Sequence, residues 1–397
     1  MKANKFLVGT LIAGALLSPA LVSCSSDDTV PTFKVGVEEV LPQGYTIQSV
    51  SATFTEVNTG AVTTTTNLNE LNLPAGTYNI EATAKVTEQN AVEKTMRAVA
   101  QNVVITEKNS SIKLDWFFFN PDNSLVISEI YLGSLNAKGT GLIYDSYIKI
   151  YNNTDETIYA DGLAICESNL NNSTDYLNLS ITPAEKFIAG TVYVIPGNGT
   201  DYPIEPGKSI KIADQAINWT EQVAKAQNHT DADFEWYDVV TIGTVRDTDN
   251  PAVPNLDKWY SYSATIWILS QQANRSYALV RFPAGVNMEK YLSDYTCSYT
   301  YTNAATSKEV TNNNKYYIPL DWIIDGVNLC PTNKSKFNCL PANIDMSYKA
   351  IADDYDKAYE NAYKTFVRRQ SGTSAAGNII LQDTDDSAKD FDIVAAF

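Results

Sequence analysis

Histidine is almost absent from this chain of 397 residues, since His229 is its only one. Histidine is the commonest general base and a frequent metal ligand. Its scarcity argues against Ser-His-Asp and Cys-His hydrolases, histidine-rich zinc sites and bis-histidine haem sites. His229 lies in the polar stretch AQNHTDADFEWYD, where we expect a surface turn. We find no catalytic motif and predict that the protein is not an enzyme.

Positive charge is also scarce, because 29 Lys and Arg face 46 Asp and Glu and give a net charge of −17. A surface this acidic repels nucleic acid and anionic lipid, and no basic cluster offsets it. Tyrosine is plentiful, with 24 residues, and Pro and Gly breaks recur. These features favour a mainly β protein of short strands and turns.

Long apolar runs are missing, and the run from Phe6 to Leu17 is too short for a bilayer, which needs about 20 residues. Two lysines precede it and small residues follow, the order of a secretory signal. We predict a signal peptide over residues 1–23. LVSC, residues 21–24, resembles a bacterial lipobox, which implies that Cys24 is acylated and anchors a tether, residues 24–31, in the membrane. The alternative is an ordinary cleaved signal with an incidental cysteine.

Four polar residues follow Cys24 and resemble the acidic export signal of surface lipoproteins in Bacteroidetes: Ser25, Ser26, Asp27 and Asp28. This resemblance implies an outer-membrane lipoprotein exposed on the cell surface. A plain charged tether is the alternative. Removal of Lys2 and Lys5 with the leader lowers the net charge by two, from −17 to −19.

The remaining cysteines are few and even in number, as expected for disulfides in an exported protein. Cys330 and Cys339 enclose the polar stretch PTNKSKFN, so we predict that they pair and leave Cys166 to pair with Cys297. No CxxC spacing suggests zinc.

Two β-rich regions are expected along the chain. Residues 32–116 alternate between apolar and polar side chains and turn at Asn58-Thr59-Gly60 and Pro74-Ala75-Gly76, which is typical of a β-sandwich. The LPAGTY element resembles transthyretin-like or carboxypeptidase-regulatory domains. Such modules usually carry or space another part of a protein.

The second region, residues 124–397, contains SEIYLGS, YIKIYNN and PGKSIKI, which together resemble the lamin-tail domain, an Ig-like sandwich. The resemblance implies Ig-like modules in tandem, with insertions in the second. Helix is scarce. The one candidate lies near residues 347–370, where alanines and tyrosines recur at helical spacing.

Several further stretches, among them VYVIPGNGTDYPIEPG, DADFEWYDV and YYIPLDWIIDGVNLC, resemble an uncharacterised lipoprotein family of Bacteroidetes with a domain of unknown function, DUF4876. The similarity runs from about residue 32 to the C-terminus. The family carries no established activity to transfer.

Acidic clusters are the candidates for chemistry. Asp383, Asp385 and Asp386 form one group that would suit calcium, which takes carboxylate and carbonyl oxygens, although no DxDxDG loop is present. Other acids surround Phe234 and Trp236. Glycosidases use two carboxylates about 5–9 Å apart, so a carboxylate-based hydrolase stays as a third hypothesis. Solvated acids without a cofactor are the simpler interpretation of all these groups.

Aromatic side chains are the candidates for ligand binding. In KWYSYSATIWIL, a continuous strand would place Trp259 and Trp267 on one polar face, about 26 Å apart at 3.3 Å per residue. Exposed tryptophans beside hydroxyls suit sugars, planar ligands or a protein interface. Trp236 and Tyr237 belong to the same candidate set. Cover by a loop or helix is the alternative.

These expectations together favour a surface lipoprotein that binds rather than catalyses. By analogy with other lipoproteins of Bacteroidetes, we expect an accessory for nutrient capture that works with a TonB-dependent transporter on a small-molecule, glycan or peptide ligand. The second hypothesis is a structural or adhesive surface protein whose aromatic residues are buried.

Overall fold

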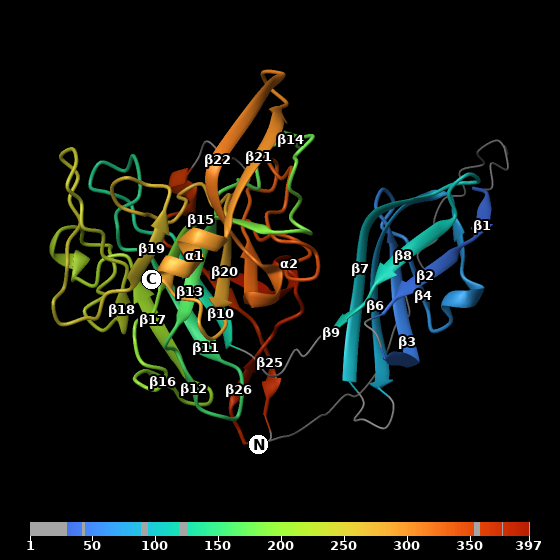
Figure 1. The fold of residues 1–397 in the computed structure, drawn as a ribbon, viewed down its shortest axis with the longest axis horizontal. Coiled ribbons are helices and arrows are strands. Elements are labelled where there is room, and N and C mark those ends of the chain that lie inside the picture. The colour runs from blue at the N-terminus through green and yellow to red at the C-terminus, as the bar shows by residue number, and fades with distance from the viewer. Residues whose placement is uncertain are drawn as a thin grey trace, which may run out of the picture.

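The computed structural model describes residues 30–41, 44–88, 94–118, 125–352, 358–374 and 376–396. The chain is mainly β, which confirms the expected fold class, and its strands form two parts with separate hydrophobic cores (Figure 1). The predicted signal peptide, the predicted lipidation site Cys24 and the predicted export signal lie outside the described residues. No helix in the described ranges is long and apolar enough to cross a membrane.

The N-terminal module holds the strands β1 to β9. They are β1 (Thr32–Lys34), β2 (Gly36–Val40), β3 (Tyr45–Glu56), β4 (Val62–Thr65), β5 (Asn72–Pro74), β6 (Gly76–Glu88), β7 (Lys94–Ile105), β8 (Ser111–Asp115) and β9 (Phe117–Phe118). The main sheet has the order β4-β3-β6-β7-β9, while β1 pairs with β5 and β2 runs parallel to β8. Alternate residues of β6, including Ile80, Ala82 and Ala84, are buried, as period-two alternation predicts.

The larger part contains a six-stranded sheet in the order β18-β17-β11-β10-β24-β27. Its strands are β10 (Leu125–Tyr131), β11 (Tyr147–Asn152), β17 (Ser209–Ala213), β18 (Phe234–Glu235), β24 (Lys364–Arg368) and β27 (Phe391–Ala395). The first and last thirds of this part therefore meet in one sheet, because β24 lies between β10 and β27.

A second sheet of eight strands has the order β14-β21-β22-β15-β13-β20-β23, with β19 paired to β15. These strands are β13 (Leu163–Ser168), β14 (Tyr176–Leu177), β15 (Phe187–Val194), β19 (Asp257–Ser261), β20 (Ser276–Arg281), β21 (Thr296–Asn303), β22 (Lys308–Ile318) and β23 (Ile323–Asn328). Two small ribbons complete the strands: β12 (Ile158–Tyr159) with β16 (Pro203–Ile204), and β25 (Gln370–Thr373) with β26 (Ile379–Leu381).

The main core lies between these two sheets. Ile127 and Ile148 of one sheet pack in the same cluster as Ile165 and Leu279 of the other. The opposite face of the eight-stranded sheet is also covered, by a second cluster that includes Ala164. Because β13 is buried on both faces, its sequence LAICES loses the alternation that marks a half-exposed strand.

The helix expected near residues 347–370 is wrong. Its described part contains only a short 3-10 turn, Ala358–Asn361, followed by strand β24. Phe366 is fully buried in β24, so pairing with β10 and β27 and burial of this ring override the helical spacing. The α-helices of the described ranges are the short α1 (Met288–Asp294) and α2 (Ser387–Asp390).

The disulfide prediction is also wrong. Four cysteines lie in the described residues, and all are free thiols: Cys166, Cys297, Cys330 and Cys339. Cys166 belongs to the cluster on the outer face of β13, and Cys330 and Cys339 are buried. Burial raises the pKa of Cys330 and of Cys339 to about 12, so these thiols stay protonated at neutral pH.

Polar contacts join the two parts of the chain. Lys389 of α2 pairs with Glu81 of β6 at 2.6 Å, and Arg97 of β7 lies 3.4 Å from Asp385. The side-chain amide of Gln101 donates to the Met346 carbonyl at 2.5 Å. Met346, Asp385 and Lys389 therefore contact one face of the β6–β7 hairpin.

Candidate functional site

The tryptophans proposed as ligand contacts are mostly core residues. Trp236 and Trp267 are buried, and their rings lie 4.9 Å apart between the two sheets. The Trp236 indole donates to the Trp267 carbonyl at 3.2 Å, and the Tyr193 ring stacks on Trp267 at 4.9 Å. These two side chains are therefore closed to a ligand, which corrects the prediction for both.

Trp259 and Trp267 do not share a strand, because β19 ends at Ser261. Trp259 is partly buried against Phe282, with ring centroids 4.5 Å apart, and lies 6.0 Å from the ring of Tyr291. Tyr237 is half-buried. The expected face with two exposed tryptophans is thus absent from this part of the described chain.

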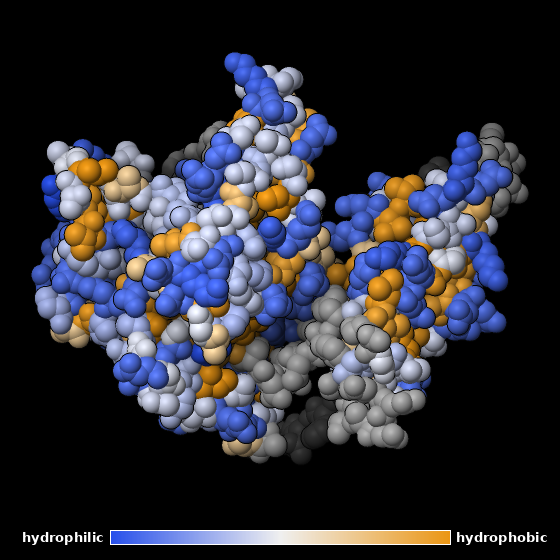
Figure 2. Space-filling view, viewed as in Figure 1, coloured by the Kyte–Doolittle hydropathy of each residue, from blue (hydrophilic) through white to orange (hydrophobic). Residues whose placement is uncertain are grey.

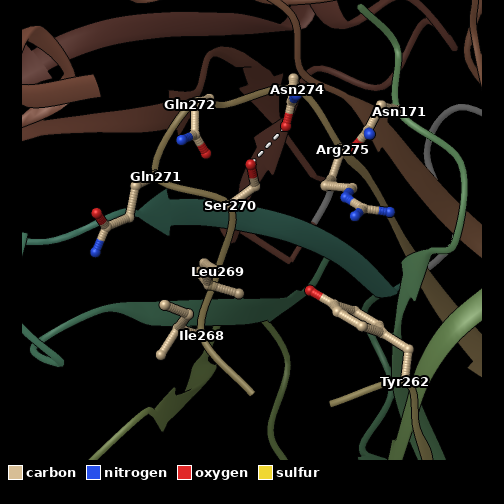
Figure 3. Close-up of a pocket in the computed structure, with 9 residues that line it drawn as sticks. All are labelled: Asn171, Tyr262, Ile268, Leu269, Ser270, Gln271, Gln272, Asn274 and Arg275. Atoms are coloured by element: carbon tan, nitrogen blue, oxygen red, sulfur yellow. Dashed lines mark hydrogen bonds between the residues drawn. The ribbon is translucent and has the colours of Figure 1, made fainter. Parts of the chain in front are cut away.

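A different group of side chains surrounds a cavity of about 300 Å³, which we call the Arg275 pocket (Figure 3). Most of its lining comes from the connection between β19 and β20. The nine lining residues are Asn171, Tyr262, Ile268, Leu269, Ser270, Gln271, Gln272, Asn274 and Arg275. Amides and hydroxyls dominate, and none of these nine residues is a carboxylate.

Hydrogen bonds fix the polar wall of the Arg275 pocket. The Ser270 hydroxyl donates to the Asn274 side-chain carbonyl at 2.6 Å, and the Asn274 amide donates to Ser173 at 3.0 Å. The backbone of Asn274 accepts from the Asn172 N–H at 2.8 Å. This loop is therefore anchored to the segment after β13.

Arg275 holds one side of the pocket. Its Nη1 donates to the carbonyls of Ser168 and Asn169 at 2.7 and 2.6 Å, and its guanidinium lies 5.4 Å from the centre of the Tyr262 ring. Its Nη2 donates no hydrogen bond to any described residue. Figure 3 shows Arg275 and Tyr262 on one side of the cavity and Gln271 and Gln272 on the other.

Glu167 lies behind Arg275 and is fully buried. Its nearer carboxylate oxygen is 4.0 Å from Arg275 Nε, and neither oxygen has a hydrogen-bond partner in the described structure. Burial raises the pKa of Glu167, and Arg275 offsets only part of that shift. Burial together with Glu167 also raises the pKa of Tyr262 to about 12, so its hydroxyl remains a donor at neutral pH.

The acidic residues considered for calcium have other partners. Asp383 pairs with the buried Arg368 at 3.0 Å, and Asp385 lies 3.4 Å from Arg97. Asp386 caps helix α2 by accepting from the Ala388 N–H at 3.2 Å. No group of three or more acidic, histidine or cysteine side chains in the described ranges has a geometry for a metal ion. These carboxylates therefore serve ion pairs and a helix cap.

Of the acids around Trp236, Glu235 and Asp238 are buried, whereas Asp231 and Asp233 are exposed. Glu235 accepts from the backbone N–H groups of Ala216 and Asn250, both at 2.7 Å, and burial raises its pKa to about 7. Asp238 accepts from the Tyr193 hydroxyl and from Lys258. Such satisfied, enclosed carboxylates stabilise loops, and none of them lines the Arg275 pocket.

His229 is also buried, at 1 % exposure, which corrects the expectation of a surface turn residue. Its Nε2 lies 2.7 Å from the Asp145 carbonyl oxygen, and burial lowers its pKa to about 4. The single histidine is thus a neutral core residue at physiological pH.

Neither Tyr262 nor Arg275 was predicted from the sequence as a site residue. The signal available was the run SQQANR between two strands, where five polar residues surround one alanine. Such a run predicts a loop, but only the fold brings it beside Asn171 and Glu167, which lie about 100 residues earlier in the chain.

Comparison with known proteins adds a family but no activity. No curated protein matches this chain. A similar solved structure is a DUF4876 family protein from Bacteroides thetaiotaomicron VPI-5482, with a TM-score of 0.50, 20 % identity, and cover of 90 % of this chain and 94 % of that one. At this identity the likeness concerns the fold alone. The model of the family described as "Protein of unknown function (DUF4876)" matches residues 205–396, so this segment is similar to the proteins of that family.

Proposed function

We propose that the protein is an outer-membrane lipoprotein of the cell surface that captures a polar ligand in the Arg275 pocket and passes it to a TonB-dependent transporter. The observation that carries the binding role is the lining of this cavity. Side-chain amides, a serine hydroxyl, a tyrosine ring and one guanidinium converge there, which is the pattern of a recognition site with fixed polar groups. The lipobox-like LVSC and the polar residues after Cys24 support the location.

The two parts of the chain have different roles in this proposal. The N-terminal module, transthyretin-like or carboxypeptidase-regulatory-like, spaces the ligand site from the membrane. The larger part, a lamin-tail-like domain with insertions, carries the pocket. Its two sheets packed around one core support this assignment, because such a scaffold positions loops rigidly. A carboxylate-based hydrolase has less support, since no lining residue of the pocket is an acid.

Binding is tested with the full lipidated chain in detergent on a glycan array. Tyr262→Ala removes the aromatic side of the pocket and should abolish any signal that the wild type gives. Tyr159→Ala is the matched control, because Tyr159 is an exposed tyrosine that does not line the pocket. Equal signals from both variants would place binding elsewhere on the surface.

Delivery is tested by affinity purification of the tagged chain from gently solubilised outer membranes. Recovery of a TonB-dependent transporter in stoichiometric amount is the expected result. Recovery of the lipoprotein alone would remove the stable complex from the proposal and leave a free-standing binder.

The alternative, a structural or adhesive surface protein, is favoured by a different observation. The connection after Asp238 exposes three aliphatic side chains, with Val239 at 71 %, Ile242 at 52 % and Val245 at 41 %. Figure 2 shows that the visible face is mostly polar, with apolar side chains exposed in small patches over both parts of the chain. Exposed apolar patches often mark contact surfaces, and burial of Trp236 and Trp267 also agrees with this alternative.

A further inference from the structure

The charge of the Arg275 pocket is opposite to that of the whole protein. The chain has a net charge of −17, yet the nine lining residues include one cation and no carboxylate. A charged ligand responds mainly to groups within about 8 Å at physiological ionic strength. An anionic group in this cavity therefore meets Arg275 before it meets the acidic surface.

The guanidinium of Arg275 has a free donor edge. Nη1 is occupied by backbone carbonyls, but Nη2 donates to no described residue, and the side chain is 16 % exposed. Arginine recognises carboxylates through parallel N–H donors. A ligand carboxylate can thus add a partner to Nη2 without breaking the bonds that hold residues 168–170.

The nearest acid in the protein does not satisfy Arg275. Glu167 stays 4.0 Å from Nε, beyond hydrogen-bonding distance, and its oxygens have no partner. Burial favours the neutral form of this carboxyl. Glu167 stabilises the Arg275 charge through space and raises the pKa of Arg275, but at 4.0 Å it leaves the guanidinium without a carboxylate hydrogen bond, which an incoming anion would supply.

The other lining groups suit hydroxyls. Gln272 and Asn171 carry amides that can both donate and accept hydrogen bonds, and Tyr262 offers a ring next to the guanidinium. We infer that the Arg275 pocket takes an acidic carbohydrate, with a sugar carboxylate on Arg275 and its hydroxyls on the amide side chains. This inference rests on the proposed binding function of the same pocket and names its ligand class.

The test uses isothermal titration calorimetry of the full chain with uronic-acid and sialic-acid oligosaccharides. Each is paired with its counterpart in which the carboxylates are reduced to hydroxymethyl groups. We expect the acidic member to bind at least about 10-fold more tightly, because its carboxylate gains a charge-assisted hydrogen bond from Nη2. Raised salt should weaken the acidic probe alone.

Variants at Gln272 test the charge without disturbing the fold, since Gln272 is half-buried and makes no hydrogen bond in the described structure. Gln272→Glu should weaken binding of the acidic probe roughly 2- to 10-fold, and Gln272→Lys should strengthen it. This is the size of effect expected from one added charge several ångströms from the ligand in a solvated cavity. Gln222→Glu is the matched control, an exposed glutamine outside the pocket lining. It should leave affinity unchanged.

The failures of the two proposals are distinguishable. If the reduced sugars bind as well as the acidic ones, and Tyr262→Ala abolishes both, the binding function stands and the acidic class is overturned. A tri-glutamate peptide that competes better than every sugar would also overturn the carbohydrate class. If no probe binds, or if Gln272→Glu and Gln222→Glu behave alike, the assignment to this pocket is overturned.

Discussion

Arg368 and Arg369 are neighbours in sequence with opposite environments, so they give a sharp test of what holds the larger part together. The Arg368 side chain is 1 % exposed and lies 2.6 Å from Asp325, 3.0 Å from Asp383 and 3.5 Å from Asp390. Its Nε also donates to the Ile127 carbonyl at 2.9 Å. It thereby ties β24 to β23, β10 and the C-terminal segment.

Replacement of Arg368 by Met keeps the volume but leaves three buried or nearly buried carboxyl groups without their cation. Breaking such a pair from one side costs about 3–5 kcal/mol of unfolding free energy. At about 2–4 °C per kcal/mol for a domain of this size, we expect Tm to fall by roughly 6–20 °C. Arg369→Met should cost less than about 1 kcal/mol, because Arg369 and its partner Asp392 are 42 % and 55 % exposed.

Thermal unfolding of the full chain, followed by circular dichroism, measures both variants. The Arg368→Met deficit should grow as pH rises from 5 to 8.5. Burial raises the pKa of Asp325 to about 7, although Arg368 lowers it. Without Arg368, ionisation of Asp325 in the folded protein costs more free energy, so the variant loses more stability than the wild type as pH rises. Equal Tm values for the two variants, or a deficit independent of pH, would refute this account of the network.

Three further predictions concern other contacts. Burial is the main cause that raises the pKa of Asp385 to about 8, so the contribution of this residue to stability is lost as pH rises from about 4 through 8. Asp385→Asn should therefore give a flatter dependence of Tm on pH than the wild type shows across that range. An unchanged slope would contradict the raised pKa of Asp385. A Cβ on Gly197, at φ +131°, would collide with the Asp161 carboxylate, which accepts the N–H groups of Gly199, Asp201 and Tyr202. Gly197→Ala should therefore cost more than about 2 kcal/mol in urea unfolding, whereas Gly60→Ala, with open space around its Cβ, should cost about 1–2 kcal/mol from its positive φ alone. Because Cys166, Cys297, Cys330 and Cys339 are free, reductant should leave Tm unchanged and unfolded protein should release four titratable thiols besides Cys24; two thiols fewer would indicate a disulfide.

The C-terminal segment shows why local pattern fails where strands from distant parts of the chain meet. Residues near 347–370 have helical spacing, yet Phe366 pairs in a sheet with Ile130 and Ile393. Spacing reports the preference of an isolated segment. The sheet adds hydrogen bonds and burial that depend on residues more than 200 positions away, so the tertiary structure wins.

The sequence by itself determined the β class, because alternation in β6 and β11 and the turns between strands are local signals. Its composition also determined the negative net charge and argued against sites that need several histidines. Only the tertiary structure decided which aromatic and charged residues face solvent. Trp236 and Trp267 lie in the core, and Asp383 forms an ion pair with Arg368. Tyr262, Arg275 and Asn171 line the same cavity. Those placements depend on how two sheets pack face to face, and packing between distant segments leaves no periodic mark in the chain.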